Sequence, residues 1–383
     1  MEIYLDNCST TRPREEVIEE MVKALRDEYG NPSSLHRLGL KAEKSIEHSR
    51  QVIASALRVS PDEVYFTSGA TESNNLAIKS IIDKYSKFGK HIITTSIEHP
   101  SVLNVMKKYE ERGYDVTYLK VDSNGVISLE ELANCIREDT ILISIMQVNN
   151  EVGSIQPTWK VKELIKEKKS RALLHVDGVQ AFGKIPVKLK DWEIDAFSIS
   201  GHKLHGPKGI GVLYINKDLK LSPVVYGGNQ ERGFRSGTEN VPGIIGLGKA
   251  VEIMEKNFEV EQDQVRKLKL YFIDRLQEID KILINSKDEY SSPYVLNVSF
   301  EYVRGEVLLH YLENKGIYVS TTSACSSKGS KKSQVLAELG LTDRQIEGAI
   351  RFCLSYEITK EDIDYTIDVL KDSVEEIRQI TMR

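Results

Sequence analysis

A lysine directly follows an apolar run of the sequence and precedes a Gly-rich turn. The run 196–200 is typical of a buried strand, and Gly201-His202-Lys203 comes next, ahead of residues 206–209. Lys203 is therefore expected at the carboxyl end of a strand, where α/β enzymes place their sites. An amine in that position can form a Schiff base with a carbonyl cofactor. A surface lysine without a catalytic role is the alternative.

An aspartate ends a second apolar run, Leu173 to Asp177. A carboxylate at a strand end can keep a pyridinium nitrogen protonated, which makes pyridoxal phosphate an electron sink. The stretch between Asp177 and Lys203 is long enough for one crossover and a return strand. An aspartate that caps a helix N-terminus is the alternative.

Small residues join another apolar run to a helix-like segment, in Thr67-Ser68-Gly69-Ala70-Thr71-Glu72-Ser73. Free backbone N–H groups at a helix N-terminus bind phosphate. An ordinary capped turn has the same composition. The phosphate of the cofactor inferred from Lys203 and Asp177 favours the binding role.

Three further polar residues follow or interrupt apolar runs. His99 comes after residues 91–95, where a histidine can stack on a cofactor ring or move protons near neutral pH. Asn150 offers an amide to a substrate carboxylate or a cofactor oxygen, although such residues are also common in turns. Arg351 is either a paired buried charge or a fork for an anionic substrate.

Cys325 differs from the other cysteines in its surroundings. It lies among small polar residues and lysines, a setting in which an exposed thiol can be reactive. Cys8, Cys135 and Cys353 lack this setting, so we expect them to pack as small apolar side chains. The four cysteines are too far apart in sequence for a CxxC metal clip or a disulfide framework, which predicts a reducing cytoplasm.

The elements that must position these residues alternate along the first two thirds of the chain. Short runs rich in Val and Ile alternate with helical periods, which predicts a doubly wound α/β domain with a mostly parallel sheet. The expected strands are residues 64–67, 91–95, 116–119, 141–148, 173–177, 196–200 and 210–215. A charged helical segment, 249–283, then leads to a smaller α+β domain. The predicted divisions are an N-terminal segment 1–15 that packs with the small domain, a large domain 16–255 and a small domain 256–383.

Composition excludes several classes of protein. Lys and Arg total 52 against 57 Asp and Glu, so the chain lacks the basic excess that nucleic-acid backbones require. Its apolar runs fall far short of the roughly 18 residues of a membrane span. The first residues do not follow the pattern of a secretory signal. We therefore expect a cytoplasmic enzyme without direct nucleic-acid or membrane contacts.

Taken together, ordered motifs over nearly the whole chain resemble the cysteine desulfurases of the NifS and IscS type, within the class V aminotransferases of fold type I. The motifs are Tyr4-Leu5-Asp6-Asn7 with Thr10-Thr11, Gly30-Asn31-Pro32-Ser33-Ser34-Leu35-His36, Glu98-His99-Pro100, Ser200-Gly201-His202-Lys203, Gly206-Pro207-Lys208-Gly209-Ile210-Gly211, Arg235-Ser236-Gly237-Thr238-Glu239-Asn240 and Ser323-Ala324-Cys325. The resemblance implies a large domain with a mostly parallel seven-stranded sheet and a smaller α+β domain.

The same resemblance implies a role for each matched residue. Lys203 would form the internal aldimine with pyridoxal 5'-phosphate, Asp177 would pair with the pyridinium nitrogen and His99 would stack over the ring. Gln180 would hydrogen-bond the phenolic oxygen. The phosphate would be held by Ala70, Thr71, Ser200, His202 and, from the second subunit of a homodimer, Thr238. Asn150 and Arg351 would bind the substrate carboxylate.

The implied activity is the removal of sulfur from L-cysteine, which yields L-alanine and a persulfide on Cys325. Acceptor proteins would take the sulfur for iron–sulfur cluster assembly or for thiolation of tRNA or cofactors, with no resident metal and at most a transient iron–sulfur contact through Cys325. Selenocysteine lyase, another class V enzyme or a non-catalytic binding protein are the alternatives. The chain departs from the family at Thr322, where glycine is usual, at Cys8-Ser9, where Ala-Ala is usual, and in the basic residues Lys328, Lys331 and Lys332.

Overall fold

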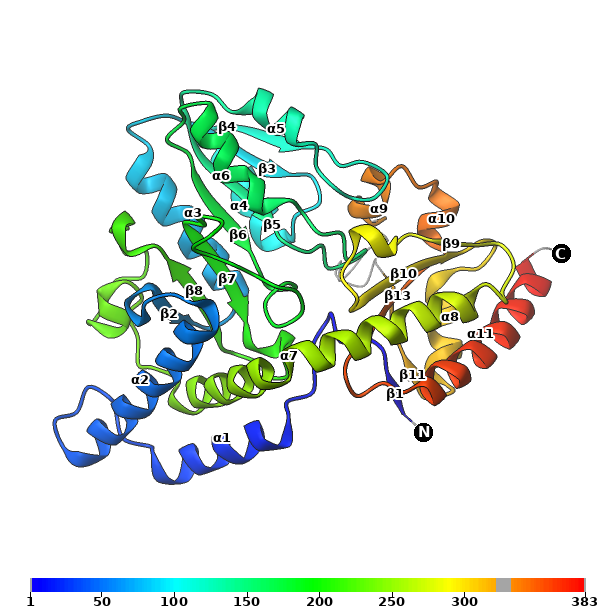
Figure 1. Ribbon diagram of the computed structural model, residues 1–383, viewed down its shortest axis with the longest axis horizontal. Helices are drawn as coiled ribbons and strands as arrows, with labels where there is room; N and C mark the ends of the chain where they lie inside the picture. The colour runs from blue at the N-terminus through cyan, green and yellow to red at the C-terminus, as the bar shows by residue number, and fades with distance from the viewer. Residues whose placement is uncertain (1, 322–331, 382–383) are drawn as a thin grey trace.

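Seven strands form the central sheet of the computed structural model, which describes residues 2–321 and 332–381 (Figure 1). In sheet order they are β2 (Val64–Thr67), β8 (Gly211–Ile215), β7 (Ala196–Ser200), β6 (Leu173–Asp177), β5 (Thr140–Met146), β3 (His91–Thr95) and β4 (Asp115–Leu119). β8 is antiparallel to both neighbours, and the pairs from β7 to β4 are parallel. The predicted mostly parallel sheet of seven strands is confirmed.

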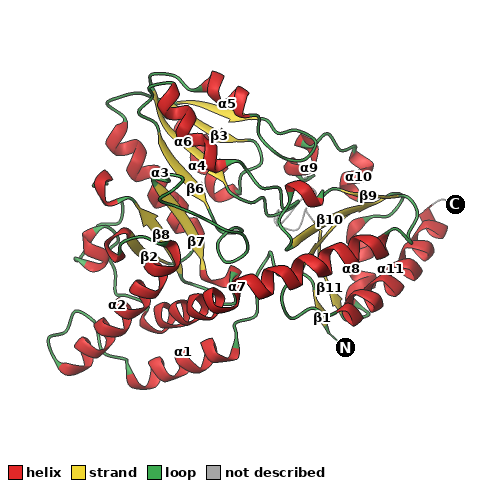
Figure 2. Cartoon of the chain, viewed as in Figure 1, coloured by secondary structure: helices red, strands yellow, loops and turns green. Residues whose placement is uncertain are grey.

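Helices cover both faces of this sheet (Figure 2). Those on the first face are α1 (Glu15–Asp27), α2 (Arg37–Leu57), α5 (Leu129–Cys135), α6 (Thr158–Glu167) and the first part of α7 (Val241–Leu276). The second face carries α3 (Ala70–Tyr85) and α4 (Pro100–Glu110). Along β8 the side chains of Val212 and Tyr214 enter the first core and those of Leu213 and Ile215 the second. Both faces of the sheet are therefore apolar, as continuous Val- and Ile-rich runs require.

The remaining strands form two smaller sheets. The four-stranded antiparallel sheet has the order β12 (Ser320–Thr321), β13 (Ala349–Cys353), β10 (Val295–Phe300) and β9 (Ile282–Ile284). At the start of the chain, β1 (Ile3–Tyr4) pairs in parallel with β11 (Ile317–Tyr318). The helices of this part are α8 (Gly305–Glu313), α9 (Gln334–Glu338), α10 (Asp343–Glu347) and α11 (Lys360–Thr381). The predicted domain limits, after residues 15 and 255, stay a prediction.

Helix α7 runs from the helices of the large sheet to those of the small sheet (Figure 1). It begins at Val241, earlier than the predicted residue 249, in spite of three glycines in its first turns. Two of them permit close packing: a Cβ on Gly246 would lie 2.6 Å from Cγ of Met21, and one on Gly248 would lie 2.7 Å from Oγ of Ser49. These glycines serve contacts with α1 and α2, so the sequence pattern alone hid the start of the helix.

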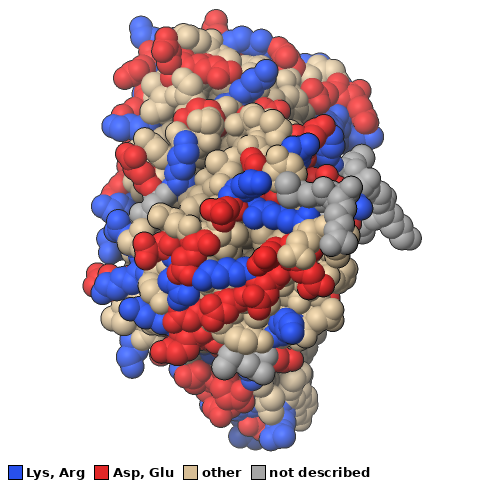
Figure 3. Space-filling model, turned by 90° about the vertical axis from the view of Figure 1, so that its right-hand side faces the viewer, with Lys and Arg blue, Asp and Glu red and all other residues tan. Residues whose placement is uncertain are grey.

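The face of the molecule that includes α11 carries acidic and basic side chains in adjoining rows (Figure 3). Ion pairs such as Arg275 with Asp364, and Lys371 with Glu278, link α7 and the turn after it to α11. Among the described residues, the helices include none that is both long and apolar enough to cross a membrane.

Cys8 and Cys353 form a disulfide, with their Cα atoms 5.6 Å apart. The prediction that these cysteines only pack is therefore wrong. Their separation of 345 residues misled the prediction, because the N-terminal segment returns to the end of β13. There the Cys353 amide donates to the carbonyl oxygen of Leu5 at 2.6 Å.

Reduction of this disulfide should lower the free energy of unfolding by about 5 kcal/mol, because the bond closes a loop that spans 345 residues of separation. Guanidinium unfolding with and without a thiol reductant measures the difference. Cys353→Ala should abolish the sensitivity to reductant, whereas Cys135→Ser should retain it, since Cys135 has no disulfide partner in the described chain. An unfolding midpoint of the wild type that ignores the reductant would contradict this prediction.

Candidate active site

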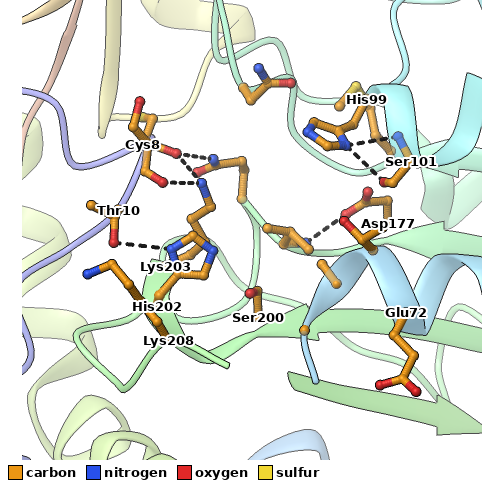
Figure 4. Close-up of a pocket in the computed structure, with 18 of the residues that line it drawn as sticks. Cys8, Thr10, Glu72, His99, Ser101, Asp177, Ser200, His202, Lys203 and Lys208 are labelled. Carbon is orange, nitrogen blue, oxygen red and sulfur yellow. Dashed lines mark hydrogen bonds between the residues drawn. The ribbon is translucent and has the colours of Figure 1, made fainter. Parts of the chain in front are cut away.

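A cavity of about 600 Å³ opens at the carboxyl ends of the parallel strands (Figure 4). The predicted cofactor and substrate residues that line it are Ala70, Thr71, His99, Asn150, Asp177, Gln180, Ser200, His202, Lys203 and Arg351. These residues are distant in sequence. They meet because β3, β5, β6 and β7 run parallel and end at the same edge of the sheet.

The amine of Lys203 points toward the N-terminal segment at this edge (Figure 4). Its Nζ donates to the backbone carbonyl oxygen of Cys8 at 2.5 Å and to that of Ser9 at 2.7 Å. Lys203 ends a 3-10 turn that starts at Gly201, where a Cβ would lie 2.9 Å from the carbonyl oxygen of Pro207. Glycine thus permits the tight turn that brings the amine into the cavity.

Asp177 ends β6, is buried, and accepts two hydrogen bonds. Its Oδ2 accepts from Nδ2 of Asn74 at 2.7 Å, and its Oδ1 accepts from the backbone N–H of Val179 at 3.1 Å. The sequence analysis missed Asn74. The signal that could have found it is an amide on the mostly apolar buried face of α3.

His99 caps the N-terminus of α4, next to Asp177. Its Nδ1 accepts from the backbone N–H of Ser101 at 3.1 Å and lies 2.8 Å from the Ser101 hydroxyl. The Ser101 hydroxyl in turn accepts from Asn74 at 2.9 Å. Burial lowers the pKa of His99, Lys203 lowers it further and Asp177 raises it. Because Nδ1 accepts hydrogen bonds, the neutral ring carries its proton on Nε2.

The turn before α3 forms the end of the cavity suited to an anion. Gly69 adopts φ +149° at the N-cap of α3, which leaves the first N–H groups of the helix at the cavity wall near Ala70 and Thr71. Ser200 and His202 also line the cavity. Burial lowers the pKa of His202 to about 4, and neighbouring lysines lower it as well. His202 is therefore a neutral hydrogen-bonding group near neutral pH.

Arg351 is both a paired buried charge and a wall of the cavity, so the two roles left open by the sequence coexist. Its Nη2 donates to Oδ1 of Asp6 at 2.8 Å and to Oγ of Ser9 at 2.7 Å. Its Nη1 donates to the backbone carbonyl oxygen of Asn150 at 2.9 Å. Among the described residues its buried Nε has no hydrogen-bond partner, so the guanidinium can bind a further anionic partner.

One predicted residue, Thr238, is not brought to the cavity in this chain, and another lies outside the described residues. Thr238 is exposed and lies in a neighbouring pocket with Gly237 and Arg235. Cys325 lies outside the described residues, as do Thr322, Lys328 and Lys331. Of the basic residues after Cys325, Lys332 is described, and its Nζ lies 2.5 Å from Oδ2 of Asp343.

Glu98, one position before His99, is a second residue that the sequence analysis did not assign. Its Oε1 accepts from the backbone N–H of Met146 and from the Thr95 hydroxyl, both at 2.8 Å. Burial raises the pKa of Glu98 to about 8, Asp177 also raises it, and the two hydrogen bonds lower it. Glu98 therefore ties the ends of β3 and β5 together as a neutral acid at pH 7.

Glu98 should make the protein less stable as the pH rises. The folded state keeps the proton up to about pH 8, whereas the unfolded chain loses it near 4.5, so stability present below pH 4.5 is lost toward pH 8. Glu98→Gln keeps an acceptor and does not titrate. We expect its stability relative to wild type to increase by up to about 4 kcal/mol between these pH values. Urea unfolding at pH 5 and 8.5 measures this, and parallel pH curves for both proteins would contradict it.

Comparison with known proteins places the chain in a family. The model of the family Aminotransferase class-V matches residues 3–366 of this chain. The chain is 43% identical over 381 residues to the cysteine desulfurase IscS of Dictyoglomus turgidum, which covers 99% of this chain and 96% of the relative. It is 44% identical over 379 residues to the cysteine desulfurase IscS of Methanosarcina thermophila, a match that covers 99% of this chain and 93% of the relative.

Solved structures of NifS-like proteins have the same fold as this chain. A NifS-like protein superimposes with a TM-score of 0.91 at 42% identity and 99% coverage of both chains. A NifS-like protein of Rickettsia africae ESF-5 superimposes with a TM-score of 0.88 at 30% identity, and the match covers 98% of this chain and 100% of that protein. The chain therefore belongs to the aminotransferase class-V family, together with the cysteine desulfurases of the IscS and NifS type.

Proposed function

We propose that this protein is a pyridoxal-phosphate-dependent cysteine desulfurase, which removes sulfur from L-cysteine and leaves L-alanine. The observation that carries the proposal is a single cavity in which an amine, a carboxylate and an imidazole meet, from Lys203, Asp177 and His99. Relatives named cysteine desulfurase match the chain over 99% of its length.

The donor set of the cavity fits pyridoxal phosphate. Lys203 would bind its aldehyde carbon, Asp177 would face the ring nitrogen, and the N-terminus of α3 would hold the phosphate with Ser200 and His202. When bound, the cofactor supplies an electron sink for the bonds at the substrate Cα.

Lys203 is placed to move a proton, and His99 is placed to hold one. Lys203, once released by the substrate amine, takes the Cα proton at Nζ, and the carbonyl groups of Cys8 and Ser9 accept hydrogen bonds from the resulting ammonium. His99 holds a proton at Nε2, so its neutral ring donates a hydrogen bond on that side.

Arg351 and Asn150 would orient the substrate. The guanidinium of Arg351 lies in the cavity wall, and its Nε has no partner in the described part of the chain, so it can bind the substrate carboxylate. Asn150 lies beside it and fixes one guanidinium nitrogen through its carbonyl oxygen. This arrangement would hold the substrate by its charged end and leave the thiol free to react.

The sulfur step belongs to Cys325 in this proposal. Its thiolate attacks the substrate sulfur, an S–S bond forms, and the C–S bond breaks with its electron pair retained by carbon, which is protonated on the way to alanine. The described residues on either side of Cys325 support the assignment because they contact residues at or next to the cavity wall. Ser320 pairs in register with Arg351, and the Ser333 hydroxyl donates to Glu151, which follows Asn150. An iron–sulfur scaffold or a thiolation enzyme would accept the sulfur.

Cys325→Ala tests the proposal as a whole. The variant should keep the visible absorbance of bound cofactor and lose persulfide and nearly all alanine production, because its thiol is the only group replaced. Mass spectrometry after L-cysteine should add one sulfur (~32 Da) to the wild-type peptide that contains Cys325. Lys203→Ala is the matched control, which should lose both absorbance band and turnover.

Sulfur on Cys8, Cys135 or Cys353 instead would refute the persulfide assignment. Wild-type desulfuration of L-cysteine by Cys325→Ala would do the same. Selenocysteine serves as a parallel substrate, and wild-type activity confined to it would support a selenocysteine lyase.

We also propose that the active unit is a homodimer. Exposed apolar side chains gather on α1, α2 and the connection between them, namely Val22, Leu25, Tyr29, Leu35, Leu38 and Leu40. A patch of this kind is typical of an interface. Thr238 is exposed outside the cavity, as expected of a residue that contacts phosphate in a second subunit.

Leu35→Glu should weaken the dimer, because Leu35 is fully exposed on a single chain and a charge would be buried in the interface. Sedimentation velocity should show more monomer than for wild type, and the monomer should bind pyridoxal phosphate more weakly. Val260→Glu on α7, also exposed but outside the patch, is the control. Full activity of a wild-type monomer at low concentration would refute the proposal.

A further inference from the structure

Lys184 is a buried lysine behind the cavity. Lys184 is 6% exposed, and its Nζ donates to Oε1 of Gln180 at 2.6 Å. The amine also lies 6.0 Å from the centre of the Tyr294 ring. From α7, Nε2 of Gln262 donates to the Lys184 carbonyl oxygen at 2.9 Å, which fixes the backbone at this position.

The burial of this amine is unfavourable. Burial lowers the pKa of Lys184 to about 7, and Lys203 and Arg351, the two charged groups that shift it, lower it further because both are cations. A buried amine costs stability unless a carboxylate compensates it. Stability therefore does not account for a lysine here, and its contact with Gln180 is the remaining candidate role.

Two contacts determine which way the Gln180 amide points. Lys184 donates to Oε1, and Nε2 donates to the carbonyl oxygen of Cys8 at 3.0 Å. The Cys8 carbonyl can only accept, so the reversed amide would lose that hydrogen bond, and it would also lose the bond to Lys184 whenever the amine is protonated. Gln180 and Cys8 line the cavity and Lys184 lies behind them, so the nitrogen of the amide is on the cavity side.

We propose that Lys184 is a positioning residue of this site, which holds Gln180 so that hydrogen-bond donors face the phenolic oxygen of the cofactor. The inference rests on the proposed function, in which Gln180 is the partner of that oxygen. A donor there stabilises the ionised oxygen and lowers the pH at which the bound chromophore releases its proton. Without Lys184 the amide is free to turn, and this pH rises.

The test is a pH titration of the visible absorption band of enzyme loaded with pyridoxal phosphate. Lys184→Met should raise the midpoint by about half a unit or more, and Gln180→Leu should also raise it. The double variant should titrate like Gln180→Leu alone, because Lys184 acts through that side chain. Lys184→Arg, which keeps the charge and the donors, should stay closer to wild type than Lys184→Met.

Thermal unfolding of the cofactor-free proteins separates positioning from packing. Lys184→Met should melt at the wild-type temperature or above, since methionine fills a similar volume without a buried amine. An unchanged midpoint in Lys184→Met, with or without a lower melting temperature, would overturn the inference. Additive midpoint shifts in the double variant would also overturn it, because Lys184 would then act directly by charge. A wild type without a visible band would instead refute the proposed function.

Discussion

The hydrogen bonds from the Lys203 amine to the carbonyl oxygens of Cys8 and Ser9 are the contact on which the site depends. Lys203 belongs to the large sheet, whereas the same N-terminal segment bonds to the small sheet through Leu5 and Cys353. One short run of backbone therefore sets both where the amine points and how the two sheets meet. The carbonyl groups serve this purpose whatever side chains occupy the positions, since main-chain acceptors are present at every residue.

The part of the site that the sequence could predict is the part that follows from strand order. Runs of Val and Ile located the seven strands, and in a parallel sheet the carboxyl ends of the strands collect at one edge. Lys203 and Asp177 are each at or directly after such an end. Their proximity is a consequence of topology, so local patterns were sufficient to predict it.

The features that the sequence did not predict depend on contacts between elements distant in sequence, which local patterns do not reveal. Asn74 bridges Asp177 and Ser101 from the buried face of α3, which is mostly apolar. The disulfide joins the N-terminal segment to β13 across almost the whole chain. The start of α7 was hidden because glycine disfavours helices in general, whereas here it admits the neighbouring helices. In each case the partner, not the residue type, determines the role.

Helix α7 has a mechanical consequence for the enzyme. Its 36 residues span about 54 Å at 1.5 Å per residue, and it contacts α1 and α2 near one end and α11 near the other. A hinge motion between the two sheets would have to bend α7 and break backbone hydrogen bonds within the helix. The continuous helix therefore fixes the spacing between the two sheets, and with it the distance between the cavity residues that the large sheet supplies and Arg351 on the small one.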